Sequence, residues 1–129
     1  MYKPFLKWGA LFALLAVILG AFGAHGLKEI LSEKAINIYE TAVRYQFYHS
    51  IALLLCGIIY KESVNKFTVL AGRFFITGII LFSGSLYFLT FNIGLPNPSM
   101  NWVGILTPIG GLFFISGWVL FILGLRGIK

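Results

Sequence analysis

The sequence predicts an all-α membrane protein, a four-helix transmembrane bundle with a short amphipathic helix between the first and second spans. Hydrophobic residues make up 59% of the 129 residues and charged residues 11%, whereas about a quarter of the residues are charged in soluble domains. Four apolar runs approach or exceed the roughly 20 residues that a helix needs to cross a bilayer. Glycine, proline and polar residues separate the runs. We therefore expect a single integral membrane domain over residues 1–129.

The first apolar run, residues 5–24, has two interpretations. Lys3 and Lys7 flank its start, and Ala21 and Gly23 lie near its end, an arrangement that resembles a secretory signal with a cleavage site. The run is longer, however, than a signal core of about 7–15 residues. Its small residues also recur three or four apart, which is typical of a face for close helix contact; they are Gly9, Ala13, Ala16, Gly20 and Ala24. We therefore expect the run to be retained as a membrane span.

A more polar segment lies between the first two runs. Ser32 can cap a helix that starts at Glu33. Four polar residues then share one helical face, at spacings of four, three and four: Glu33, Asn37, Glu40 and Arg44. Glu40 and Arg44 form an i,i+4 pair, and we expect an amphipathic helix that lies at the interface or leans on the bundle. The second run, residues 45–60, is short by itself, so we expect it to continue this helix into the membrane.

The third and fourth runs cover residues 67–91 and 102–125. In the fourth run, Pro108 has two interpretations. It kinks a single helix that starts near Trp102, or it is the first residue of a helix capped by Thr107; we favour the kinked helix. Glycines recur every seven residues in this run and predict a second close-packing face: Gly110, Gly117 and Gly124.

The net charge is +6, and the basic residues lie beside or between the apolar runs. They indicate membrane orientation and contact with anionic headgroups, so we expect no nucleic-acid partner. With a cytoplasmic N-terminus, seven cations are inside and three outside. The inner set is Lys3, Lys7, Lys61, Lys66, Arg73, Arg126 and Lys129, and the outer set is Lys28, Lys34 and Arg44. Because cytoplasmic loops carry the excess of Lys and Arg, we predict a cell-membrane protein with both termini in the cytoplasm.

A stretch at the end of the first run, Gly-Ala-Phe-Gly-Ala-His-Gly-Leu at residues 20–27, resembles the signature of the domain-of-unknown-function family 423. Residues 45–50, 82–87 and 107–111 agree with it in order, so the resemblance covers essentially the whole chain. The animal transmembrane protein 256 group is similar. The resemblance implies a small bacterial multi-pass membrane protein, and it implies no particular reaction.

The polar residues of the spans fall in the same half of the predicted bundle, on the side away from the termini. An unpaired polar group in hydrocarbon costs several kcal/mol, so we expect these residues to converge on one hydrogen-bonded cluster with His25 and His49 central. Its candidate members are His25, Arg44, Gln46, His49, Ser83, Ser85 and Thr107. Such a cluster is either a site for a small ligand or lipid headgroup, or a lock between helices.

No residue is predicted to be catalytic or to hold a metal or cofactor. Cys56 shares a face with His49 but lies seven residues away, about 10.5 Å along a helix, and no carboxylate lies inside a run. Three function classes remain. We favour a non-enzymatic envelope component that acts through membrane lipids, a partner protein or a homo-oligomer. The alternatives are an oligomeric transporter or channel for a small solute, and an intramembrane enzyme that uses the two histidines.

Overall fold

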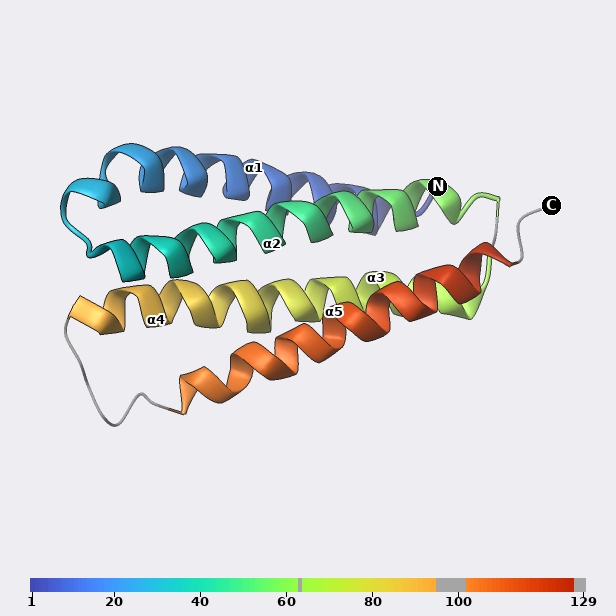
Figure 1. Ribbon diagram of the computed structural model, residues 1–129. Helices are drawn as coiled ribbons and strands as arrows, with labels where there is room; N and C mark the ends of the chain where they lie inside the picture. Colours follow the sequence, from blue (N-terminus) through green and yellow to red (C-terminus); the bar gives the residue numbers. More distant parts are fainter. Residues whose placement is uncertain (63, 95–101, 127–129) are drawn as a thin grey trace.

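The computed structural model describes residues 1–62, 64–94 and 102–126, which form four long antiparallel helical rods (Figure 1). Their elements are α1 (Lys3–His25), η1 (Leu27–Glu29), α2 (Glu33–Ile59), α3 (Lys66–Gly78), η2 (Ile79–Ser83), α4 (Gly84–Gly94) and α5 (Val103–Leu125). Helices α3 and α4 form one rod with η2 between them. Each of the four rods is long and apolar enough to cross a membrane. The predicted all-α bundle is confirmed.

The rods pair as two hairpins. Helix α1 packs along α2, and α5 packs along α3. Helix α2 also contacts α3, η2 and α4, so it joins the two hairpins and is the most buried rod. The start of α1, the connection from α2 to α3 and the end of α5 lie at one end of the bundle, while η1 lies at the other (Figure 1).

The polar segment before the second run is the first part of α2 rather than a separate short helix. Ser32 caps it as predicted, because its hydroxyl oxygen accepts a hydrogen bond from the amide of Ala35 at 3.3 Å. No proline or glycine occurs between Glu33 and Gly57, so nothing in the backbone interrupts the helix where the sequence turns apolar. The expected continuity with residues 45–60 is confirmed, and the connection before it contains only the short 3₁₀ turn η1.

The third rod contains a π-helical turn, η2, which the sequence pattern did not predict. Asn65 caps the start of the rod, with its side-chain oxygen accepting from the amide of Thr68 at 2.9 Å. At η2 the backbone of Phe82 lies against Gly110 of α5, so closely that a Cβ atom on Gly110 would overlap it. The extra residue in the π turn rotates α4 relative to α3.

Helix α5 runs unbroken through Pro108, so the interpretation as one helix is correct and a helix that starts at Pro108 is not observed. Its predicted glycine face is confirmed, since all three glycines are buried against the third rod: Gly110, Gly117 and Gly124. The small-residue face of α1 is confirmed for Gly9 and Ala16, whereas Ala24 is exposed and Gly23 is buried in its place.

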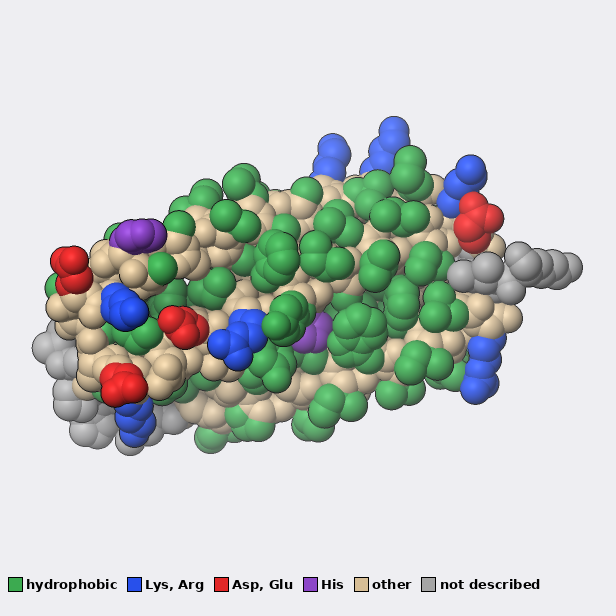
Figure 2. All heavy atoms as spheres, turned by 45° about the horizontal axis from the view of Figure 1, so that its top comes forward, with side chains coloured by type: hydrophobic (Ala, Val, Ile, Leu, Met, Phe, Trp, Pro, Cys, Tyr) green, Lys and Arg blue, Asp and Glu red, His purple; other side chains and the backbone are tan. Residues whose placement is uncertain are grey.

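The main core lies between all four rods and consists of aromatic and aliphatic side chains, with Phe75, Phe114 and Leu53 among them. A smaller core near η1 contains Leu27, Ile36 and Tyr39. Figure 2 shows apolar side chains over the middle of the visible face and most charged side chains toward the two ends. This distribution matches a bilayer, in which the hydrocarbon contacts the middle and the headgroups contact the ends.

Candidate functional site

Gln46 of α2 joins three rods through its buried side chain, which is 4% exposed. Its amide nitrogen donates to the backbone oxygen of Phe12 in α1 at 2.9 Å, and its amide oxygen accepts from the hydroxyl of Tyr87 in α4 at 2.8 Å. Its own backbone oxygen accepts a bond from Ser50 at 2.6 Å. A buried amide must pair both of its ends, and Gln46 does so with two different helices.

Two further bonds run from side chains to backbone carbonyls of neighbouring helices. Tyr39 donates to the oxygen of Leu19 in α1 at 2.7 Å, and Ser83 donates to the oxygen of Ala42 in α2 at 2.8 Å. A helical carbonyl keeps a second lone pair for such a bond. The rings of Tyr39 and Tyr87 also meet edge to face, with centroids 5.3 Å apart. These contacts fasten the half of the bundle nearest η1.

The second histidine lies between the hairpins, and both of its ring nitrogens are occupied. Nδ1 of His49 lies 2.7 Å from the backbone oxygen of Tyr45, and the indole nitrogen of Trp118 donates to Nε2 at 3.3 Å. Because an indole N–H can only donate, Nε2 must accept, and the ring proton lies on Nδ1. His49 is therefore a neutral imidazole with no nitrogen left for a substrate.

Aromatic rings enclose His49 on the α5 side. Phe114 stacks on the imidazole with centroids 3.5 Å apart and planes 9° apart. Trp118 meets it edge to face at 6.2 Å, and Phe75 of α3 lies 5.7 Å away. The side chain is 5% exposed. The His49 ring thus packs as one of the aromatic side chains that form the contact between α2, α3 and α5.

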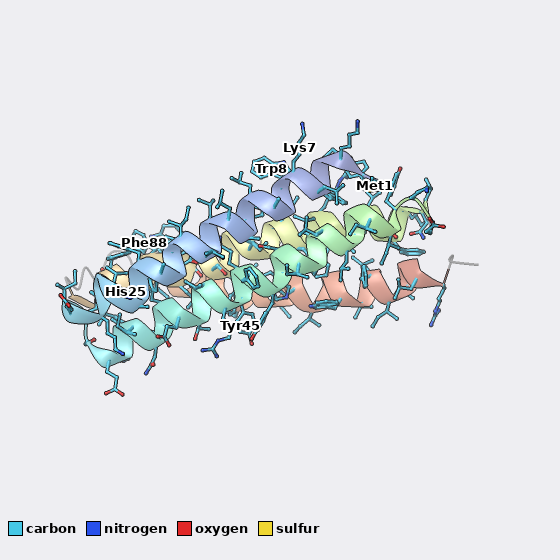
Figure 3. All side chains as sticks on the ribbon, turned by 90° about the horizontal axis from the view of Figure 1, so that it is seen from above. Met1, Lys7, Trp8, His25, Tyr45 and Phe88 are labelled. Carbon is cyan, nitrogen blue, oxygen red and sulfur yellow. The ribbon has the colours of Figure 1, made fainter. Side chains whose placement is uncertain are left out.

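The structure does not bring His25 to this group. His25 is exposed at the end of α1, and its Nδ1 lies 3.1 Å from the oxygen of Ala21 in the same helix. Figure 3 shows His25 at one end of the bundle and Tyr45, one turn before His49, farther along its axis. The expectation of a single cluster with both histidines central is not met, because His25 lies beyond the last buried turn of α1.

The remaining candidates divide among different partners. Ser85 shares a hydrogen bond of 2.7 Å with Thr107 of α5, whereas Ser83 faces α2. Two residues apart on a helix are about 200° apart around it, so the two serines serve opposite interfaces. Arg44 is exposed on α2. The predicted residues therefore do not form one cluster. Some of them form separate hydrogen-bonded contacts, and two of the residues, His25 and Arg44, lie at the surface.

The sequence interpretation missed Tyr39, Tyr87 and Trp118 as members of these contacts. A signal was available, because Tyr and Trp in an apolar segment each carry one polar atom that needs a partner when buried. Among the described residues, every buried side-chain nitrogen or oxygen has a hydrogen-bond partner. The buried polar groups of the described residues are therefore paired inside the protein, and several of these bonds join one helix to another.

Comparisons with known proteins agree with the sequence resemblance. The family described as "Protein of unknown function (DUF423)" matches residues 19–111. A UPF0382 membrane protein of Staphylococcus epidermidis is 44% identical over 94% of this chain and 93% of its own length. The UPF0382 membrane protein YwdK of Bacillus subtilis is 38% identical over 93% and 94%, and a UPF0382 membrane protein of Haemophilus influenzae is 40% identical over 92% and 90%. No solved structure matches.

Proposed function

The chain belongs to the DUF423 family, whose relatives above are named as membrane proteins, and from this premise we propose that it is a non-enzymatic component of the cell envelope. It acts through contacts that its lateral surface makes with lipids or with a partner protein. Both termini lie in the cytoplasm in this proposal. The outward end of the bundle is then the one that carries η1.

The observation that supports this proposal is the pairing of the buried polar groups. An acid or base in catalysis needs a nitrogen or oxygen within reach of the substrate, and both nitrogens of His49 are bonded inside the protein. A solute path needs polar groups that face water. The buried polar side chains of the described residues are instead hydrogen-bonded inside the protein, which leaves the outer surface as the part that can act.

The charge pattern supports the orientation. The described cations at the end with the termini are Lys3, Lys7, Lys61, Lys66, Arg73 and Arg126, whereas Lys28, Lys34 and Arg44 belong to the other half. Because cytoplasmic segments carry the excess of Lys and Arg, this bias favours the richer end as the cytoplasmic one.

Native mass spectrometry after extraction in a mild detergent tests the proposal, since it reports bound lipid, partner and subunit number together. We expect the wild-type protein to retain lipid or a partner protein. Solute flux or substrate turnover by the purified protein, abolished in a folded His49→Phe variant, would overturn the proposal.

The orientation is tested by labelling introduced cysteines with a reagent that does not cross membranes. The predicted topology suggests positions 63 and 97, which lie in its loops, as labelling sites. Both lie outside the described residues. Lys34→Cys and Lys61→Cys lie on opposite ends of the bundle and are exposed. In a Cys56→Ala background, intact cells should label position 34 and leave position 61 unlabelled. The reverse pattern contradicts cytoplasmic termini.

A further inference from the structure

We propose that the outer-half groove between α1 and α2 binds a phospholipid whose headgroup carries an amine beside its phosphate. Arg44 binds the phosphate and Glu40 binds the amine, while the groove below them holds an acyl chain. The inference rests on the proposed function, because it names the lipid and the site through which the lateral surface acts.

The groove exists because small residues of α1 face larger ones of α2. It has a volume of about 360 Å³ and is lined by Ala16, Val17, Gly20, Ala21, Val43, Arg44, Phe47 and Tyr48. A second hollow of about 250 Å³ shares Gly20, Val43 and Arg44 with it, and reaches Glu40 at the end nearest η1. Arg44 therefore stands where the two hollows meet, with an apolar channel on its deeper side.

The two charged side chains at the groove have no partner within the described part of the protein. Both Arg44 and Glu40 are exposed, and no hydrogen bond or ion pair with a described residue involves either, so the i,i+4 pair that the sequence suggested between them is not formed. Cations at this depth are costly unless they reach the headgroups or pair with an anion. A lipid phosphate is the anion that a membrane supplies there, and a guanidinium binds phosphate in a bidentate manner.

The order of the charges along α2 matches the order of groups in an aminophospholipid. Glu40 precedes Arg44 by one turn toward the η1 end, a rise of about 6 Å. In such a lipid the phosphate lies next to the glycerol and chains, and the amine lies farther out. Arg44, on the deeper side, therefore meets the phosphate, and Glu40, on the shallower side, meets the amine. A phosphate headgroup without an amine leaves Glu40 unpaired beside an anion.

The apolar channel below Arg44 suits a hydrocarbon chain better than a helix. On the α1 side the groove is shallow, because Gly20 and Ala21 are small. On the α2 side it is bounded by the exposed rings of Phe47 and Tyr48. A second copy of the protein packed here by small residues would need a matching apolar ridge and would bury Arg44 away from the headgroups. The unpaired charges thus favour a lipid over a second copy.

Native mass spectrometry of the detergent-solubilised full chain tests the proposal with phosphatidylethanolamine and phosphatidylglycerol as probes. Wild-type protein should bind phosphatidylethanolamine more tightly than phosphatidylglycerol. Arg44→Gln should weaken binding of both lipids about tenfold, the effect of losing one charge-assisted hydrogen-bonded contact. Glu40→Gln should weaken only phosphatidylethanolamine and abolish the preference. Lys28→Gln, an exposed cation outside the groove, is the matched control and should bind as the wild type does.

Three results would overturn the inference: equal binding by wild type and Arg44→Gln, a preference for phosphatidylglycerol in the wild type, or disulfide-linked dimers formed efficiently through Ala21→Cys in a Cys56→Ala background. Each leaves the broader proposal of a contact-based function standing, because the protein can still act through other lipids or a partner. Thermal unfolding of Arg44→Gln and Glu40→Gln should match that of the wild type, since both side chains are exposed. A lost lipid signal is then a lost site rather than a lost fold.

Discussion

The two helix hairpins are both packed through glycine, yet they are held in different ways. In the hairpin of α3, η2 and α5, Gly78 and Gly117 receive phenylalanine rings from the opposite helix. In the α1–α2 hairpin, most of the facing side chains are aliphatic and one is the ring of Tyr39, which lies against Gly23. Hydrogen bonds to backbone carbonyls add to this contact. We call the line of contact between the two rods of a hairpin its seam. The seam between α5 and the third rod depends on shape alone along its middle, whereas the α1–α2 seam combines shape with hydrogen bonds.

The seam between α5 and the third rod is regular. Gly117 faces the ring of Phe75, and Gly78 of α3 in turn faces the ring of Phe114. At the two ends of this seam, Ser85 bonds to Thr107 and Asn65 donates to the oxygen of Gly124 at 3.0 Å. A ring seated on a glycine leaves little room for adjustment, because protein interiors are close-packed.

The α1–α2 seam is tight near the termini and again at Gly23, where a Cβ atom would lie 2.5 Å from the ring of Tyr39, and it is more open between them, at Gly20. Gly9 faces Leu54 and Gly57 faces Leu6, but at Gly20 a Cβ atom would meet only Val43, at 3.2 Å. On either side of this opening, Gln46 and Tyr39 donate hydrogen bonds to carbonyls of α1. Hydrogen bonds can thus hold a membrane hairpin together where its surface is hollow, and such a hollow leaves room for a ligand.

The largest effect is expected at His49, which joins the two hairpins. His49→Ala removes the ring stacked on Phe114 and leaves the Trp118 indole without its acceptor. Truncation of a buried ring leaves a cavity, so we expect a loss of about 2–4 kcal/mol in the free energy of unfolding. Denaturation in detergent, followed by Trp fluorescence, measures it. Unchanged stability with lost lipid or ligand binding would instead mark His49 as a site.

The next largest effect is expected in the seam between α5 and the third rod, which depends on shape. Gly110→Ala places a methyl group on the backbone of Phe82, which cannot rotate away, and overpacking costs typically about 1–3 kcal/mol. Gly104→Ala is the matched control, since nothing lies within 4 Å of its Cβ position. That variant should be neutral or slightly stabilising, because alanine favours helix over glycine by about 1 kcal/mol. Equal melting temperatures for the two variants would show that the seam is loose.

A moderate effect is expected for Gln46, whose hydrogen bonds join α2 to α1 and to the other hairpin. Gln46→Leu and Tyr87→Phe each remove one end of the 2.8 Å bond between α2 and α4. Interhelical hydrogen bonds in membranes contribute about 0.6 kcal/mol, with a maximum near 1.7, and Gln46→Leu also loses the bond to Phe12. A double-mutant cycle in unfolding free energy should give a coupling of that size. A coupling of zero would mean that the bond between α2 and α4 contributes nothing to the contact between the two hairpins.

The smallest effect is expected at Gly20. Its half-buried position and single 3.2 Å contact with Val43 leave space for a methyl group after a small shift, so Gly20→Ala should change stability by less than about 0.5 kcal/mol. Gly117→Ala, where a Cβ would lie 2.8 Å from the Phe75 ring, should cost more. Thermal unfolding of the pair compares the two seams directly. A Gly20 variant as unstable as the Gly117 variant would contradict an open groove.

Much of the fold follows from local sequence. The length and apolarity of a run decide whether it spans, because the bilayer acts as a solvent of fixed thickness. The Ser32 cap and the seven-residue spacing of Gly110, Gly117 and Gly124 are local patterns of the same kind, and each is found in the structure. The match of residues 20–27 to a family signature also needed no coordinates.

Tertiary structure alone decided which polar groups meet. A sequence gives the depth of a residue along its helix, but not the rotation of that helix or the identity of its neighbour. His25 and His49 were assigned to one cluster by depth, yet His25 faces outward and His49 pairs with Trp118, 69 residues away. Ser83 and Ser85 have similar depths and different partners, and the π turn that ends at Ser83 changes the rotation again. Such contacts depend on how four rods settle against one another, and no local pattern contains that information.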